Sequence, residues 1–190
     1  MNAPARIAPA AMVAPYCGFS ARDFCEMLGV GAFSDMRVEL VGGEFQKMAP
    51  ASSGHSRQNF SIAERLITAF RTAKVGVEIG TDLAVAIDDT TVRGIDIAFS
   101  KSGFAAAGPT PASSIFLAVE IADTTLSRDL GEKVADYARV GIPHYWVVDL
   151  NGKAVHVMSE PVGQGYAQRS IVRFGEDLAV PGTDQTIQID

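Results

Sequence analysis

The segment "IFLAVEIADTTLSRDLGEKVADYARVGIPHYWVVD", residues 115–149, decides the fold class. Residues 115–122 are almost continuously apolar, which is typical of a central strand covered on both faces. A helix is predicted over residues 129–140, and residues 144–150 form a second apolar strand. A strand, a helix and a strand in this order predict a right-handed crossover between parallel neighbours, and therefore an α/β domain.

Glu120 is the one carboxylate inside the first of these strands. Burying an isolated carboxylate costs several kcal/mol, so Glu120 must be neutral, paired with a cation, or at the edge of a wet cleft. Asp96, in "GIDIAF", repeats the pattern 24 residues upstream, on a strand expected to be its neighbour. Two adjacent acids repel each other unless a cation lies between them. The pair therefore suggests a divalent metal with oxygen ligands, Mg²⁺ or Mn²⁺.

Lys133 is the third candidate site residue. Asp129 and Glu132 have the spacing of a capping box, which would start the helix near residue 129 and place Lys133 in its first turn. A cation there opposes the helix dipole, so helix stability does not explain it. The start of this helix follows the carboxyl end of the Glu120 strand, where α/β crossovers expose their functional crevice. A solvated i, i+4 pair between Asp129 and Lys133 is the plain alternative.

The remaining segments predict a mixed β-sheet flanked by helices, with an N-terminal β-hairpin and antiparallel C-terminal strands. A short helix is expected over residues 20–28, and a hairpin turns at Gly42–Gly43, directly before Glu44. Residues 55–73 carry a helical stripe that includes Phe60. Strands are expected over residues 75–79, 82–87 and 92–100, and the C-terminal strands follow a turn at "NG", residues 151–152.

Composition predicts one domain over residues 20–190, preceded by a flexible tail over residues 1–19. No apolar run approaches the roughly 20 residues that cross a bilayer, so no membrane association is expected. Cys17 and Cys25 complete neither a disulfide framework nor a zinc site, which favours a reducing cytoplasm. The net charge of −6 argues against a protein that coats nucleic acid non-specifically. Neither a dinucleotide-binding glycine motif nor a P-loop is present.

Several sequence blocks occur in a specific order and spacing. They are "VELVGGEFQKMAP" followed by a histidine, then "VRGIDIAF", and then "DLGEK", "YARVGIP" and "YWVVD" in the last segment. In these blocks the chain resembles the Uma-type restriction endonuclease family, a branch of the PD-(D/E)XK nuclease superfamily, over roughly residues 20–180. The resemblance implies that Asp96 and Glu120 hold the metal. The chain departs from the superfamily motif at two positions. Ile95 stands where the motif has proline, and Ala122 stands where it has lysine. The Uma-type family is similar here, its lysine lying on the following helix, which implies Lys133.

The resemblance implies a restriction-endonuclease-like fold and a Mg²⁺- or Mn²⁺-dependent endonuclease that hydrolyses DNA. Glu44 would be a further catalytic acid. His55 and Arg57 are candidates for substrate contact, His55 being alternatively a helix-start residue. A homodimer is expected by analogy, with the apolar C-terminal strands as interface. The alternative function is an inactive nuclease-fold module that binds nucleic acid or protein. Each acid also has a plain structural interpretation when it is considered alone. Asp96 could accept a hydrogen bond from a backbone N–H, and Glu120 could form an ion pair with an arginine. Glu44 could be an ordinary polar residue after a turn.

Overall fold

A computed structural model describes residues 18–48 and 53–190. The predicted tail up to residue 17, with Cys17, lies outside the described residues. The helices and strands are α1 (Ala21–Gly29), β1 (Val38–Val41), β2 (Glu44–Lys47), α2 (Ser53–Thr72), β3 (Glu78–Asp88), β4 (Thr91–Ser100), β5 (Thr110–Pro111), the 3₁₀ turn η1 (Ala112–Ser114), β6 (Ile115–Ala122), α3 (Leu126–Asp129), α4 (Glu132–Arg139), β7 (His144–Asp149), β8 (Ala154–Val162), β9 (Gly165–Arg173), β10 (Leu178–Ala179) and β11 (Thr186–Ile187).

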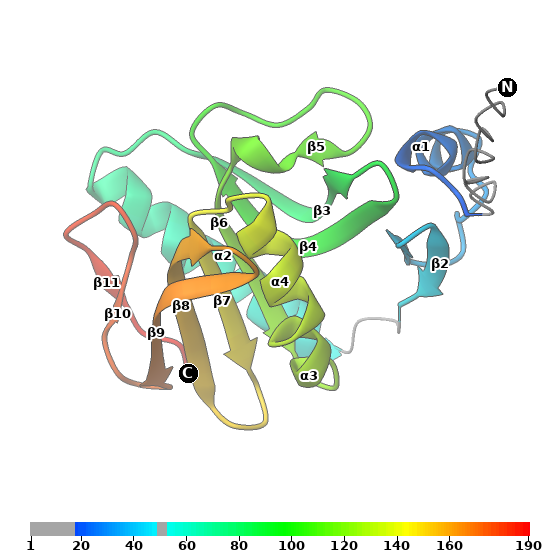
Figure 1. Ribbon diagram of the computed structural model, residues 1–190. Helices are drawn as coiled ribbons and strands as arrows, with labels where there is room; N and C mark the ends of the chain where they lie inside the picture. The colour runs from blue at the N-terminus through cyan, green and yellow to red at the C-terminus, as the bar shows by residue number, and fades with distance from the viewer. Residues whose placement is uncertain (1–17, 49–52) are drawn as a thin grey trace, which may run out of the picture.

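A large, mostly antiparallel sheet runs through the molecule in the order β2-β1-β4-β6-β7-β8-β9, with β3 beside β4 (Figure 1). Strands β6 and β7 are parallel neighbours, with Leu117 opposite His144 and Ala122 opposite Asp149. The predicted parallel pair joined through a helical segment is therefore confirmed. The C-terminal strands β8 and β9 are antiparallel, as predicted. The fold is the expected mixed sheet flanked by helices.

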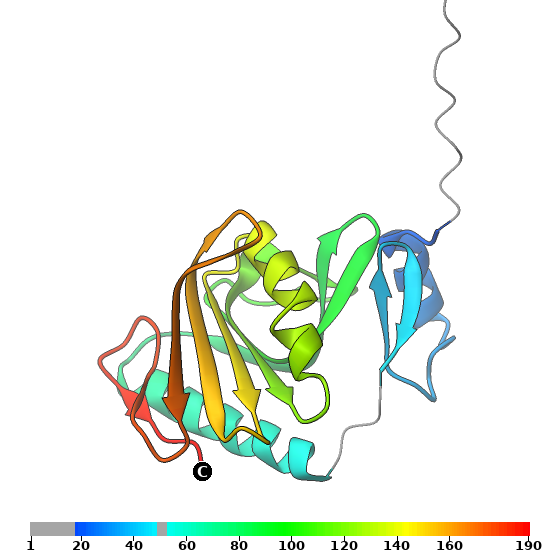
Figure 2. The ribbon, with the colours of Figure 1, turned by 60° about the horizontal axis from the view of Figure 1, so that its bottom comes forward.

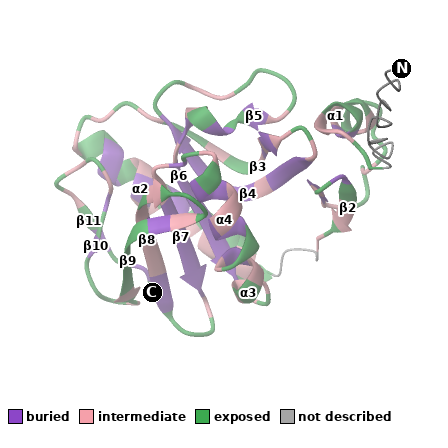
Figure 3. Cartoon of the chain, in the orientation of Figure 1, coloured by how far each residue is buried: buried purple, intermediate pink, exposed green. Residues whose placement is uncertain are grey.

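Helices cover both faces of this sheet. Helix α2 lies along one face, and α3 and α4 lie on the other (Figure 2). The central strands are buried from both sides (Figure 3), which explains the nearly continuous apolar run of β6. Within the described residues, no helix is long and apolar enough to cross a membrane.

The apolar face of α2 differs from the predicted stripe at one position. Phe60 is 71% exposed, whereas Ile62 is 1% exposed. The buried stripe runs through Ile62, Leu66 and Phe70, a spacing of four residues that keeps these side chains on one side of the helix. Phe60 falls on the opposite side, so its assignment to the core was wrong.

The predicted helix over residues 129–140 is broken into α3 and α4 at Gly131. Gly131 has φ −112° and ψ −96°, and a Cβ there would lie 2.7 Å from the carbonyl oxygen of Ser127. Asp129 is consequently the last residue of α3, and Glu132 begins α4 without a side-chain cap. The predicted capping box was therefore wrong, because a residue that breaks the helix stands between its two members.

The N-terminal elements follow the local sequence signals. Ser20 caps α1 in a capping box with Asp23, and β1 and β2 form the predicted hairpin around Gly42–Gly43, whose φ angles are positive. Phe19, assigned from sequence to the tail, stacks on Phe45 at 4.3 Å and donates its N–H to the carbonyl of Gly43. Phe19 therefore packs with the domain that was predicted to begin at residue 20.

The two strands predicted over residues 75–79 and 82–87 are a single strand in the structure. Strand β3 runs from Glu78 to Asp88 and pairs with β4 along its length. In place of the expected break, only Asp82 departs from the regular strand: it has φ +51° and forms no pair in the β3–β4 ladder. Asp82 also pairs with Arg37 at 2.7 Å, which joins the loop before β1 to β3.

Candidate active site

One edge of β4 carries a gap between two neighbouring strands. Val92 pairs with Ala86 of β3 and with Leu40 of β1, while Ile97 pairs with Thr81 of β3 and with Val119 of β6. A strand has only two edges, so β1 and β6 must share the edge opposite β3. In the described part of the chain, residues 93–96 form no ladder pair with another strand on that edge.

Side chains take the place of the absent strand partner. The Gly94 N–H donates to Glu39 Oε1 at 2.9 Å, and the Gly94 carbonyl accepts from Lys133 Nζ at 2.8 Å. On the other border of the gap, the Ile121 N–H donates to Asp96 Oδ2 at 2.8 Å. Buried backbone groups need such partners, so the gap itself requires polar side chains at these positions. The predicted Asp96 and Lys133 meet there.

Lys133 lies at the centre of a buried cluster of carboxylates. Its Nζ is 2.9 Å from Glu120 Oε1, 3.3 Å from Glu39 Oε1 and 3.9 Å from Asp129 Oδ1. Lys133 is fully buried, and the three acids are at most 2% exposed. The Tyr137 hydroxyl donates to Glu120 Oε1 at 2.8 Å. The solvated Asp129 pair considered from sequence is therefore excluded: the contact exists, but it is buried and longer than the contact with Glu120.

The charges of this cluster shift the pKa values of its members. Burial raises the pKa of Glu120 well above its ordinary value, although Lys133 acts in the opposite direction. Burial also disfavours ionisation of Glu39, but Lys133 and the Gly94 amide outweigh it and hold its pKa below the usual value. Burial opposes the charge of Lys133 as well, yet the surrounding carboxylates raise its pKa. Lys133 therefore stays charged, and Glu120 is the acid on which a proton is held most readily.

Asp96 reaches the gap from β4 and is 6% exposed. Its Oδ1 is 3.4 Å from His55 Nε2 and 3.6 Å from an Arg37 nitrogen. Burial works against its ionisation, but the contacts with His55 and the Ile121 amide keep its pKa lowered. The hydrogen bond with Asp96 in turn raises the pKa of His55. His55, in the first turn of α2, therefore lies beside Asp96.

Asp96 and Glu120 face the same gap from adjacent strands. The β4–β6 ladder ends at the pair of Ile97 and Val119, and beyond it the Asp96 carboxylate accepts from the Ile121 N–H in place of a backbone bond. Asp96 contacts His55 of α2, whereas Glu120 contacts Lys133 and Tyr137 of α4, so helices on opposite faces of the sheet hold the two acids that border the gap. Each contributes electrostatically to this one centre: the charge of Asp96 raises the pKa of Glu120, and Lys133 lowers the pKa of both.

Glu39 and Arg93 are site residues that the sequence interpretation missed. Arg93, 1% exposed, contacts Glu39 Oε2 at 3.2 Å and Asp136 at 2.8 Å, so it is a second buried counter-ion beside Lys133. The signal for Glu39 was present in "VELV", an acid inside an apolar strand, which is the same signal that identified Asp96 and Glu120. The third predicted acid, Glu44, is exposed after the hairpin turn and takes no part in these contacts.

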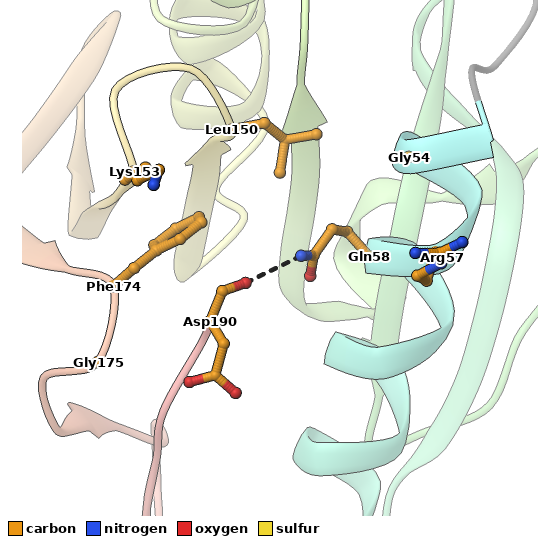
Figure 4. A pocket seen from close by; sticks show the side chains of 8 residues that line it. All are labelled: Gly54, Arg57, Gln58, Leu150, Lys153, Phe174, Gly175 and Asp190. Atoms are coloured by element: carbon orange, nitrogen blue, oxygen red, sulfur yellow. Dashed lines mark hydrogen bonds between the residues drawn. The ribbon is translucent and has the colours of Figure 1, made fainter.

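Arg57, the other predicted substrate residue, also lies outside the ion cluster. It is exposed on α2, two residues after His55, and lines a separate pocket of about 600 Å³ at the start of that helix (Figure 4).

The donor chemistry of Asp96 and Glu120 fits a hard divalent cation. Both supply carboxylate oxygens, the ligands that Mg²⁺ and Mn²⁺ prefer. The contacts that described residues make with Glu120 all fall on Oε1, so Oε2 remains for a ligand. Among the described residues, no three His, Cys, Asp or Glu side chains are already arranged to hold a metal ion. A cation held by these two acids would therefore take further ligands from water or substrate.

Comparisons with known proteins agree with this architecture. The model of a family described as "Uma2: Putative restriction endonuclease" matches residues 21–190. The crystal structure of a putative nuclease belonging to DUF820 from Anabaena variabilis ATCC 29413 superposes with a TM-score of 0.67 and 13% sequence identity, covering 90% of this chain and 94% of that chain. At that identity the likeness concerns the fold alone. The comparison with curated proteins found no match.

Proposed function

The chain belongs to the Uma2 family, and from that membership we propose that it is a metal-dependent endonuclease that hydrolyses phosphodiester bonds of DNA. The observation that carries the proposal is the convergence of Asp96, Glu120 and Lys133 on the gap in the edge of β4. A buried lysine beside two strand carboxylates is the charge pattern that phosphoryl transfer needs, since negative charge must be stabilised as the attack proceeds.

Asp96 and Glu120 would hold the cation, which polarises a phosphoryl oxygen and lowers the pKa of a bound water. Lys133 supplies a fixed positive charge at the same place, which would stabilise the negative charge that develops on the phosphoryl oxygens. Glu39 and the Gly94 carbonyl hold its ammonium from the hairpin side. Tyr137 fixes Glu120 from α4. Each group is buried and already bonded, so little reorganisation accompanies the reaction.

His55 is positioned to contact the substrate at the border of the site. Its imidazole lies beside Asp96 at the start of α2, and that carboxylate raises the pKa of His55. A charged imidazole can donate to a phosphate oxygen of the strand being cut.

The test is cleavage of supercoiled plasmid with Mg²⁺ or Mn²⁺ by wild type, Asp96→Asn and Glu120→Gln. Both substitutions keep the shape of the side chain and remove its charge, and Glu44→Gln is the matched control because Glu44 is exposed. We expect wild type and control to cleave alike and both site variants to lose about 100-fold or more in rate, as transition-state electrostatic groups commonly do. Undiminished cleavage by both site variants would contradict the assignment.

A binding module that kept the fold without the chemistry is the second candidate. The observation in its favour is that Lys133 already neutralises Glu120 at 2.9 Å, so the cluster is charge-compensated without a metal. Calorimetric titration of Mn²⁺ into wild type and Asp96→Asn separates the two. The endonuclease proposal expects binding by wild type that the variant loses, and equal heats for the two proteins favour the binding module.

A further inference from the structure

A pocket of about 600 Å³ opens beside the first turns of α2, against the β7–β8 turn and the end of β9 (Figure 4). Leu150 and Phe174 supply apolar walls, and the Gln58 side chain closes one side by donating to the Asp190 carbonyl at 2.9 Å. The volume lies in the range of pockets that enclose small ligands. A groove that followed only a phosphate backbone would need neither this depth nor an aromatic wall.

Two cations at this pocket are available to a ligand. Arg57 and Lys153 both line it and are exposed, and neither has a carboxylate partner among the described residues. The acid that also lines the pocket, Asp190, has its carboxylate directed away from Gln58 (Figure 4), where it pairs with Arg65 at 2.7 Å. In a chain of net charge −6, this local excess of positive charge is complementary to an anion.

The pocket and the candidate active site meet at the same end of α2. His55 contacts Asp96, whereas Gly54, directly before it, and Arg57, two residues after it, line the pocket. These positions lie within one helical turn, about 5.4 Å along the axis. The pocket and the candidate active site therefore both adjoin the first turns of α2.

We propose that this pocket binds an unpaired nucleotide of the DNA strand being cut, with its two flanking phosphates at Arg57 and Lys153, on opposite sides of the pocket, and its base against Phe174. The inference rests on the proposed nuclease function and names the substrate class, DNA that is single-stranded beside the cut. A base paired in a duplex cannot enter a concave pocket, whereas an unpaired base can, and stacking on an aromatic side chain tolerates any base.

The first test measures DNA binding without cleavage, by fluorescence anisotropy in EDTA with a labelled 12-nucleotide single strand. The variant is Arg57→Ala/Lys153→Ala, and the control is Arg71→Ala/Lys74→Ala, which removes the same two charges at the far end of α2. Loss of two phosphate contacts lowers the salt slope by about 1.4, equivalent to about 60-fold weaker binding at 50 mM salt and about 10-fold at 200 mM. The control should bind like wild type.

The second test addresses the base. Phe174→Leu should weaken single-strand binding by about 5-fold or more, the effect of losing one stacked base. Phe60→Leu, which alters an exposed aromatic on α2, is the control. A duplex of the same sequence should be insensitive to Phe174→Leu. Thermal melting checks the fold of each variant. If Phe174→Leu does not fold, the Arg57→Ala/Lys153→Ala variant alone tests whether the single strand binds in the pocket.

The proposal is overturned if the Arg57 and Lys153 variant binds the single strand no more weakly than its control, or if Phe174→Leu weakens duplex binding as much as single-strand binding. Because no cleavage is measured, the outcome is separate from that of the plasmid assay. Weakened binding by pocket variants of a protein that cuts no DNA would support the pocket and refute the endonuclease proposal.

Discussion

Replacing Lys133 with methionine removes one charge from the centre of the buried cluster and keeps a side chain of similar length. Glu39, Glu120 and Asp129 then face one another without the ammonium that lies within 4 Å of each. All four groups are at most 2% exposed, so water cannot replace the lost cation without a change in the fold. Breaking a buried ion pair in this way costs about 3 to 5 kcal/mol.

The cost should depend on pH. Without Lys133, the carboxylates have folded-state pKa values above their unfolded ones. Stability that depends on their protonated forms is then present below the unfolded pKa and lost as pH rises through the raised pKa. Urea unfolding should therefore show a large difference between Lys133→Met and wild type at pH 8 and a smaller one at pH 5. With a slope of about 2 kcal/mol per molar urea, the midpoint at pH 8 falls by about 1.5 to 2.5 M.

Lys153→Met is the control, because Lys153 is exposed and should change stability by no more than about 0.5 kcal/mol. If Lys133→Met lowers the free energy of unfolding at pH 8 by less than about 1 kcal/mol, that result would refute the argument. Removal of a buried and fully engaged ammonium should cost more than that. Equal losses at pH 5 and pH 8 would refute the electrostatic origin of the effect.

Three further predictions concern single positions. Because burial raises the pKa of Glu120, wild type should lose stability relative to Glu120→Gln as pH rises from 5 to 8, measured by urea unfolding; a constant difference would contradict the raised pKa. Gly131→Ala places a Cβ 2.7 Å from the Ser127 carbonyl oxygen and should destabilise the protein by about 1 to 3 kcal/mol in thermal unfolding, whereas an unchanged midpoint would show that the helix break tolerates a side chain. Ile171 and Val162 are 59% and 63% exposed on the C-terminal strands, so light scattering should find a homodimer that Ile171→Lys dissociates, and a monomeric wild type would rule this out.

Most of the fold could be predicted because its signals are local. The apolar run of β6, the apolar strand β7 and the glycine pair of the hairpin each identify an element without knowledge of its neighbours. The failures depend on tertiary context. Phe60 fits a helical stripe as well as Ile62 does, and only packing against the sheet selects the buried side. The break at Gly131 depends on an unusual backbone conformation that glycine permits but does not require.

The site could be predicted in part for the same reason. Asp96 and Glu120 stand out as acids in apolar strands, and Lys133 stands out as a cation near a helix start. Glu39 carries the same signal as the two acids, but its place in the cluster follows from the pairing of β1 with β4, which brings together residues more than 50 positions apart. The gap in the edge of β4 is likewise a property of three strands together, and no segment of the sequence contains it.

The central claim is that Asp96 and Glu120 jointly hold a divalent cation beside Lys133. Anomalous diffraction from a crystal soaked in Mn²⁺ tests it most directly, because manganese is located without reference to any assumed ligand. The account predicts one strong peak within coordination distance of both carboxylates. A manganese ion bound elsewhere, with both acids still in contact only with their present protein partners, would contradict it.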